Sequence, residues 1–252
     1  MLQKAFDTST AKQTDPLWCA IMQPTYLPWS GYFNLIARVK HFVFLDDVQY
    51  ERQSWQCQNR ILRQKAAFFL RLPVIKSPLN TKIEDILVDG TAWRKAHRDL
   101  VWENYRISPY IDQVMVLFDD AFLEDEQQHL ADINISLIKN IATALALPTR
   151  FVRARDLACG GRRSEHLDAI CRKLGATDYL SPQGSAAYLG QDGFTKFARA
   201  RLHFQQFEPI PYPQIGDGQF VSYLSIIDQI AHLGLAATRA YVTGETNEVT
   251  SY

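Results

Sequence analysis

The sequence lacks the features that mark several large classes of protein. No run of about 18 apolar residues occurs, so we expect no membrane span. Neither sign of charge is in excess, because 27 basic residues stand against 27 acidic ones, and this balance argues against a nucleic-acid partner. Residues 1–17 are polar and lack the apolar segment of a signal peptide. These absences indicate a soluble protein, and we expect it to be cytoplasmic.

Familiar metal and nucleotide motifs are absent as well. The four cysteines form no C-x-x-C pair, which is typical of reduced thiols in a reducing compartment. No H-x-x-x-H or H-E-x-x-H spacing occurs, so no metal site is predicted from histidines. The lack of G-x-G-x-x-G, P-loop and G-x-S-x-G motifs excludes the common dinucleotide-binding, Walker-type and serine hydrolase families. We interpret His97 and His166 as ordinary helix residues.

What is present is the material for one globular domain. Apolar residues make up 47% of the 252-residue chain, which is enough for a complete core without disulfides or metals. A chain of this length most often folds as a single domain. We therefore expect one α/β domain over residues 18–242, with disordered segments at 1–17 and 243–252.

The start of this domain carries a strand-helix-strand pattern. Residues 18–22 and 41–45 are short apolar runs, which is typical of buried strands. Between them, residues 32–39 carry apolar side chains at helical spacing. A β-α-β unit implies parallel strands joined by a right-handed crossover. The sequence therefore predicts an open, mainly parallel, Rossmann-like sheet flanked by helices.

Strand and helix patterns continue along the rest of the chain. Residues 46–60, between the second and third strands, are expected to form a loop that contributes to a site. Later strands are predicted at 67–72, 151–154, 178–180 and 202–207, and helices at 91–105, 124–147, 164–174, 185–189 and 224–233.

Polar and aromatic side chains follow several predicted strands. In an open parallel sheet, ligands bind beyond the carboxyl ends of the strands, near the point where strand order reverses. We therefore expect these side chains to share one pocket. The candidates are two catalytic carboxylates, Asp46 and Asp47, and a substrate-binding set of Gln23, Tyr26, Trp29, Gly31, Tyr32, Gln49, Trp55, Asn59, Arg60, Ser181, Tyr212 and Gln214.

Each of these residue types has a functional and a structural interpretation. Asp46 and Asp47 can bind Mg²⁺ or ribose hydroxyls or act as a base, but acidic residues also cap turns. Tyr26 and Trp29 can stack on a base or sugar, or can simply pack the loop. Arg60 suits a phosphate or carboxylate, or an ordinary surface ion pair. Beyond the Mg²⁺ option, the sequence identifies no cofactor.

The same residues resemble the WbqC-like protein family. The resemblance spans roughly residues 18–236 and implies a role in the assembly of bacterial surface polysaccharide such as O-antigen. It rests on residues 23–33 (QPTYLPWSGYF), 44–50 (FLDDVQY), 54–55, 59–61, 174–181, 212–214 and 224–228. The family signature falls on Gln23, Pro24, Tyr26, Pro28, Gly31, Tyr32, Asp46, Gln49, Trp55, Asn59 and Arg60.

Two positions depart from the family pattern. Gln23 stands where many members carry histidine, and an amide cannot exchange protons near neutral pH. Gln58 stands where a basic residue is more usual. Residues 21–50 are also similar to the first βαβ unit of the nucleotidylyltransferase and pantothenate-synthetase superfamily. Residues 29–32 occupy its H-x-G-H position and keep only the glycine, so the fold is implied without that chemistry.

Two functions follow as hypotheses. The first is an enzyme that transfers an acyl or aminoacyl group to a nucleotide-linked amino sugar, with a nucleotide-linked or phosphorylated small molecule as its partner. The second is a non-catalytic subunit that binds a nucleotide sugar or acts as a scaffold. The two carboxylates followed by Asn59 and Arg60 favour the enzyme, whereas the amide at Gln23 favours the binding subunit.

Overall fold

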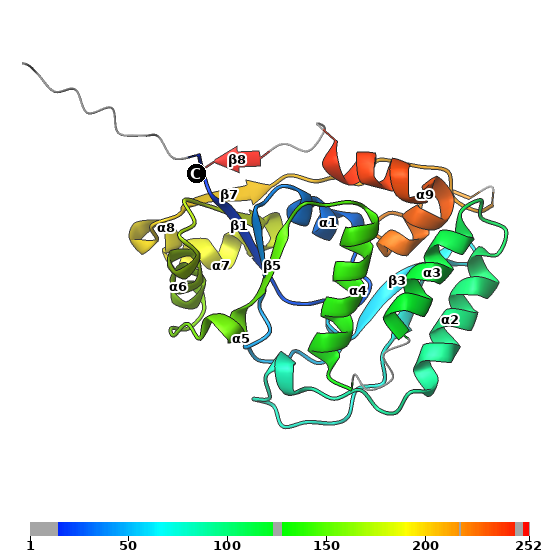
Figure 1. The fold of residues 1–252 in the computed structure, drawn as a ribbon, viewed down its shortest axis with the longest axis horizontal. Coiled ribbons are helices and arrows are strands. Elements are labelled where there is room, and N and C mark those ends of the chain that lie inside the picture. Colours follow the sequence, from blue (N-terminus) through cyan, green and yellow to red (C-terminus); the bar gives the residue numbers. More distant parts are fainter. Residues whose placement is uncertain (1–14, 123–127, 217, 245–248, 252) are drawn as a thin grey trace, which may run out of the picture.

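The computed structural model describes residues 15–122, 128–216, 218–244 and 249–251 (Figure 1). Six strands pair in the order β5-β2-β1-β6-β7-β8, and the first five of that order run parallel. The predicted Rossmann-like, mainly parallel sheet is therefore confirmed. The strands are β1 (Trp18–Met22), β2 (His41–Phe44), β5 (Arg150–Arg153), β6 (Asp178–Pro182), β7 (Arg201–Gln205) and β8 (Val249–Ser251).

Helices cover both faces of this sheet. Figure 1 shows α6 and α8 on one side of the strands, with α1, α4 and α9 on the other. The helices are α1 (Ser30–Ala37), α2 (Ala92–Tyr105), α3 (Ile111–Phe122), α4 (Leu130–Ala144), α5 (Ala154–Leu157), α6 (Ser164–Leu174), α7 (Ala186–Gln191), α8 (Phe194–Phe197) and α9 (Ile226–Thr243), with 3₁₀ turns at Ile83–Asp85 and Gln183–Ser185.

The parallel strands are buried on both faces, which explains why they read as continuous apolar runs. In β1, Cys19 and Ile21 pack into a core with α6, α7 and α8. Ala20, between them, faces the opposite core, to which Phe42 and Phe44 of β2 also belong. Because successive side chains of a strand point to opposite faces, a strand between two helical layers needs apolar residues at every position.

The order of the strands reverses between β1 and β6. From β1 the chain crosses through α1 to β2, and β5 then pairs with the outer edge of β2. From β6 the sheet instead grows in the other direction, to β7. The carboxyl ends of β1 and β6 therefore flank the switch point at which open α/β sheets bind ligands.

A separate antiparallel hairpin corrects the prediction for residues 46–60. Asn59 and Arg60 lie in β3 (Gln58–Arg63), not in a loop, and β3 pairs with β4 (Ala66–Arg71). The predicted strand at 67–72 thus exists but belongs to a two-stranded sheet outside the main one. Gln64 and Lys65 connect the strands, both with positive φ (49° and 65°), as two-residue hairpin turns of the primed type require.

The helix predictions need several corrections, and the short helices α5 and α8 are absent from them. Helix α3 was not predicted, and α4 begins at Leu130, so it is shorter than the helix expected over 124–147. Helix α9 continues to Thr243, and its kink at Gly234 (φ 76°, ψ 169°) explains why the helical pattern ends at residue 233.

Within the predicted C-terminal tail, Val249–Ser251 forms β8 and pairs with β7. Residues 1–14 of the predicted N-terminal segment lie outside the described residues.

Candidate functional site

A cavity of about 390 Å³ opens at the carboxyl end of the sheet. Gln23 follows β1, and Leu45, Val48 and Gln49 follow β2, so two strand ends form one wall. The first turn of α6 and the adjacent α7 form the other. We call this space the dyad cavity; its lining residues are Gln23, Leu45, Val48, Gln49, Arg163, His166, Leu167 and Tyr188.

An acid-histidine pair, Asp47 with His166, gives this cavity its name. The His166 Nε2 atom lies 3.1 Å from the Asp47 carboxylate, and Nδ1 lies 3.1 Å from the carbonyl oxygen of Gly160. A carbonyl oxygen only accepts, so Nδ1 carries a proton and donates it. When the ring is protonated, Nε2 donates to the Asp47 carboxylate. His166 and Asp47 side chains are 8% and 11% exposed, so water screens this contact only weakly.

The pair changes the proton affinity of the imidazole. The hydrogen bond to Asp47 raises the pKa of His166 above its usual 6.5, against an opposing effect of burial, and the bond to Gly160 acts in the same direction as Asp47. Both contacts are favourable only while both ring nitrogens carry protons. The two contacts thus favour an ion pair of imidazolium and carboxylate.

The neighbouring carboxylate, Asp46, has a different environment. Its side chain is fully buried; Oδ2 accepts from Arg153 Nε at 2.5 Å, and Oδ1 accepts from the Arg155 backbone N–H at 3.3 Å. Arg153 also pairs with Asp132. Asp46 therefore joins β2 to the end of β5 and to α5. Neither predicted catalytic carboxylate lines the cavity, but Asp47 contacts His166, which does.

These partners do not fit a Mg²⁺ ion bridging the two carboxylates. Both oxygens of Asp46 already accept hydrogen bonds, one from a guanidinium that a cation would have to displace. Within the ranges that the structure describes, no group of three or more His, Cys, Asp or Glu side chains is placed to hold a metal ion.

A second cavity, of about 260 Å³, lies on the other side of the segment that follows β1. The two cavities share this segment as a wall: Tyr32, which lines the second cavity, donates its hydroxyl to the Gln23 backbone carbonyl at 3.0 Å. The Gln23 side chain accepts from Gln56 Nε2 at 2.9 Å. We call the second cavity the aromatic cleft; it is lined by Met22, Thr25, Trp29, Tyr32, Trp55, Asn59, Arg60 and Tyr223.

The predicted site residues are divided between several places. Trp29, Tyr32, Trp55, Asn59 and Arg60 line the aromatic cleft, whereas Gln23 and Gln49 line the dyad cavity beside Asp47. The single shared pocket that the sequence suggested is thus divided, and Tyr212 and Gln214 line a third cavity of about 340 Å³.

Three further predicted residues are engaged inside the fold. Tyr26 is fully buried, and its hydroxyl lies 2.8 Å from His97 Nδ1. Ser181 is fully buried and donates to the Tyr179 hydroxyl at 3.3 Å. Gly31 lies against the Trp29 indole, because a Cβ at this position would fall 2.2 Å from Trp29 Cζ2. The absence of a side chain at Gly31 therefore makes room for the Trp29 indole of the same protein.

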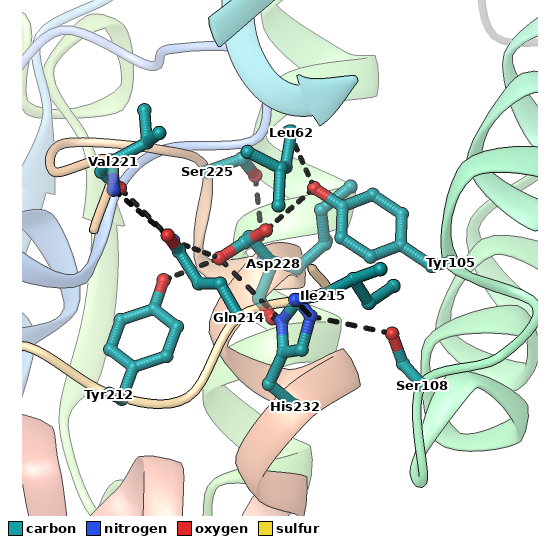
Figure 2. A network of polar contacts seen from close by, with 11 residues as sticks. Leu62, Tyr105, Ser108, Tyr212, Gln214, Ile215, Val221, Ser225, Asp228 and His232 are labelled. Carbon is teal, nitrogen blue, oxygen red and sulfur yellow. Dashed lines mark hydrogen bonds and ion pairs between the residues drawn. The ribbon is translucent and has the colours of Figure 1, made fainter. Parts of the chain in front are cut away.

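Tyr212 and Gln214 belong to a buried network around Asp228, shown in Figure 2. The fully buried Asp228 accepts from Tyr212 (2.6 Å) and Gln214 (3.0 Å) at Oδ2, and from Tyr105 (2.8 Å) at Oδ1. His232 Nε2 accepts from the Ile215 N–H at 2.9 Å. This network fastens Tyr212, Gln214 and Ile215 to α9, and Tyr105 joins it to α2.

His166 is the functional candidate that the sequence interpretation missed. It was read as a helix residue because it has no partner nearby in sequence: Asp47 is 119 positions away. Its position supplies a signal, since the first turn of a helix that follows a parallel strand lies at the ligand-binding edge of the sheet. Arg163 and Tyr188 line the same cavity and were likewise not predicted.

Fold and cavities together define an α/β protein with a buried carboxylate-histidine pair beyond the carboxyl ends of a Rossmann-like sheet. Among the described residues, no helix has the length and apolar character to cross a membrane. Residues 23–240 match the model of the WbqC-like protein family, and the chain belongs to that family. The uncharacterized protein Rv1507c of Mycobacterium tuberculosis is 30% identical over 219 residues, which cover 86% of this chain and 94% of that protein. No solved structure matches the chain significantly.

Proposed function

We propose that the protein is a cytoplasmic group-transfer enzyme of bacterial surface-polysaccharide or related metabolite assembly. In this proposal the Asp47–His166 pair accepts the proton of an amino group on a nucleotide-linked sugar. The observation that carries the proposal is the position of the pair, whose histidine lines a cavity at the carboxyl ends of β1 and β2. The resemblance noted above supplies the polysaccharide context.

The chemistry asked of the pair is general base catalysis. The amino nitrogen of the acceptor sugar attacks the carbonyl carbon of an acyl or aminoacyl donor. A C–N bond forms, the bond from the carbonyl carbon to the donor's leaving group breaks, and the proton released by nitrogen passes to the pair. A pKa near the working pH suits this task, because the group must be free to take a proton and strong enough to hold it.

The proposal fixes the direction of the pH dependence. His166 must lose its own proton before the pair can accept another, and contact with Asp47 raises the pKa of His166 above 6.5. The rate constant kcat/KM should therefore rise with pH through a value above 6.5. The Asp47→Asn variant removes the carboxylate that raises this pKa, so its residual activity should show the inflection at lower pH.

Turnover is the direct test. Purified protein is incubated with nucleotide-linked amino sugars and acyl donors, and acylated products are detected by mass spectrometry. We expect His166→Gln and Asp47→Asn each to lower kcat by about 100-fold or more. His129→Gln and Asp99→Asn are matched controls, because both residues lie outside the two cavities and their side chains are 50% and 51% exposed.

The outcome separates catalysis from binding alone. If His166→Gln and Asp47→Asn turn over as fast as the wild type, the pair is not catalytic. If the wild type binds nucleotide sugars but forms no product with any donor, the protein is instead a nucleotide-sugar-binding subunit.

A further inference from the structure

The aromatic cleft combines rings with a cationic group. Trp29 and Tyr223 lie with ring centroids 5.1 Å apart on one part of the wall. Trp55 contributes another part, and the Arg60 guanidinium carbon lies 5.5 Å from the centre of its ring. Aromatic faces accept flat, π-rich groups by stacking, and a guanidinium binds anions by charge-assisted hydrogen bonds.

Two of these rings are exposed to an unusual extent. Trp55 is 48% exposed and Tyr223 is 41% exposed, whereas most aromatic side chains in the described part of the chain are buried or half-buried. Exposed aromatic rings grouped around a concavity mark binding sites more often than scattered surface residues do.

The positive charge of Arg60 is not balanced by a protein carboxylate. In the described part of the chain Arg60 forms no ion pair, and its Nη2 atom donates to the Tyr223 carbonyl at 2.9 Å. Its Nε atom is buried and has no hydrogen-bond partner. A partly buried guanidinium without an anion leaves electrostatic stabilisation unused, which an anionic ligand can supply.

The backbone holds this arrangement in place. Tyr223 has a positive φ of 57°, which is unfavourable for an aromatic residue, and such a conformation persists only when its surroundings impose it. Here the Arg60 side chain holds the Tyr223 carbonyl, and the Ser225 N–H donates to the Arg60 carbonyl at 2.7 Å. Arg60 thus positions Tyr223 at the edge of the cleft.

We propose that the aromatic cleft binds a planar ring that carries an anionic group, with the ring against Trp55, Trp29 and Tyr223 and the anion on Arg60. At about 260 Å³ the cleft is smaller than the about 300–1,000 Å³ of pockets that enclose a whole ligand, so it holds one part of a larger substrate. The inference rests on the proposed function for its setting: the ring and anion belong to the carrier, and the dyad cavity takes the reacting group.

Nucleotides and aromatic acids share this chemistry, and binding measurements distinguish them. The full-length protein is titrated by calorimetry with UDP, ADP and indole-3-acetate, and with uridine and pyrophosphate as the separate parts. We expect a compound with both ring and anion to bind more tightly than uridine or pyrophosphate. UDP or ADP binding identifies a nucleotide carrier; indole-3-acetate binding alone identifies an aromatic acid.

Two variants test the contacts. Trp55→Leu should weaken binding by about 10-fold, the size of a lost stacking contact, and Arg60→Lys should do the same because lysine lacks the planar fork. Trp102→Leu removes a tryptophan of similar exposure (44%) on α2. Arg71→Lys changes an arginine of the same hairpin that stacks on Phe69 (4.9 Å) outside the cleft. Both controls should bind as the wild type does.

The two proposals fail separately. The inference is overturned if none of the ring-bearing anions binds at millimolar concentration, or if Trp55→Leu and Arg60→Lys bind as tightly as their controls while remaining folded by circular dichroism. His166→Gln should leave binding at the cleft unchanged. If the dyad variants turn over as fast as the wild type while the cleft still binds its ligand, only the proposed function is refuted.

Discussion

The buried histidine of α2, His97, should make the protein less stable in acid in a way that one substitution removes. Burial lowers the pKa of His97 to about 4, although its hydrogen bond to the Arg71 backbone acts in the opposite direction. Tyr26 is buried, and this burial raises the pKa of its hydroxyl well above 10, so the hydroxyl donates and His97 Nδ1 accepts. The ring is therefore neutral in the folded protein.

The sign and size of the effect follow from proton binding. In the unfolded chain a histidine binds its proton near pH 6.5, whereas folded His97 binds it near pH 4. Between these values the unfolded state holds more protons, so the free energy of unfolding rises with pH. The contribution is fully present above about pH 6.5 and is lost as pH falls to about 4. At about 1.4 kcal/mol per pH unit, it amounts to about 3 kcal/mol.

Chemical denaturation of wild type and His97→Gln at several pH values between 4 and 7 measures this contribution. Glutamine does not titrate. As pH falls across this range, the free energy of unfolding of the wild type should therefore drop by about 3 kcal/mol more than that of the variant. Carboxylates such as Asp119 and Asp178, whose ion-pair partners lower their pKa against the effect of burial, titrate alike in both proteins and cancel in the difference. His129→Gln, at an exposed histidine, should follow the wild type. Parallel curves for wild type and His97→Gln would refute the argument.

Two further substitutions test packing around the site. Asp46→Asn should lower the free energy of unfolding, measured by urea denaturation, by about 3 kcal/mol, because the partly buried Arg153 loses one of its two carboxylate partners. A decrease of less than about 1 kcal/mol contradicts this. Gly31→Ala should lower the melting temperature and change tryptophan fluorescence, because the new Cβ would fall 2.2 Å from the Trp29 indole. Gly190→Ala is the control: no atom lies within 4 Å of its Cβ, so it should neither lower the melting temperature nor change the fluorescence.

The local sequence determined the framework of the sheet. The apolar runs of β1 and β2 with the helical pattern between them predict a βαβ unit, and the structure pairs these strands in parallel, Cys19 opposite His41 and Met22 opposite Phe44. The pattern is strong because strands between two helical layers must be apolar on both faces. The acidic residues directly after β2 were likewise visible, since they stand where a buried strand ends.

The sequence could not show that Asn59 and Arg60 lie in a hairpin. Strand β3 reads QNRILR and begins with three polar residues, so it resembles a loop when no partner strand is assigned. Pairing with β4, a tertiary fact, makes the segment a strand. The same pairing places Arg60 beside Tyr223, 163 positions along the chain.

Tertiary structure alone decided the roles of the two adjacent aspartates. Local sequence context does not separate Asp46 from Asp47, although the family signature falls on Asp46 alone; successive residues project in different directions once the chain leaves the sheet. Asp46 thereby meets Arg153 at the end of β5, and Asp47 meets His166 in α6. One carboxylate is committed to joining elements of the fold, and the other pairs with a histidine that lines the cavity. No spacing in the sequence encodes this division, because each partner lies more than 100 residues away, on an element brought near only when the parallel strands assemble.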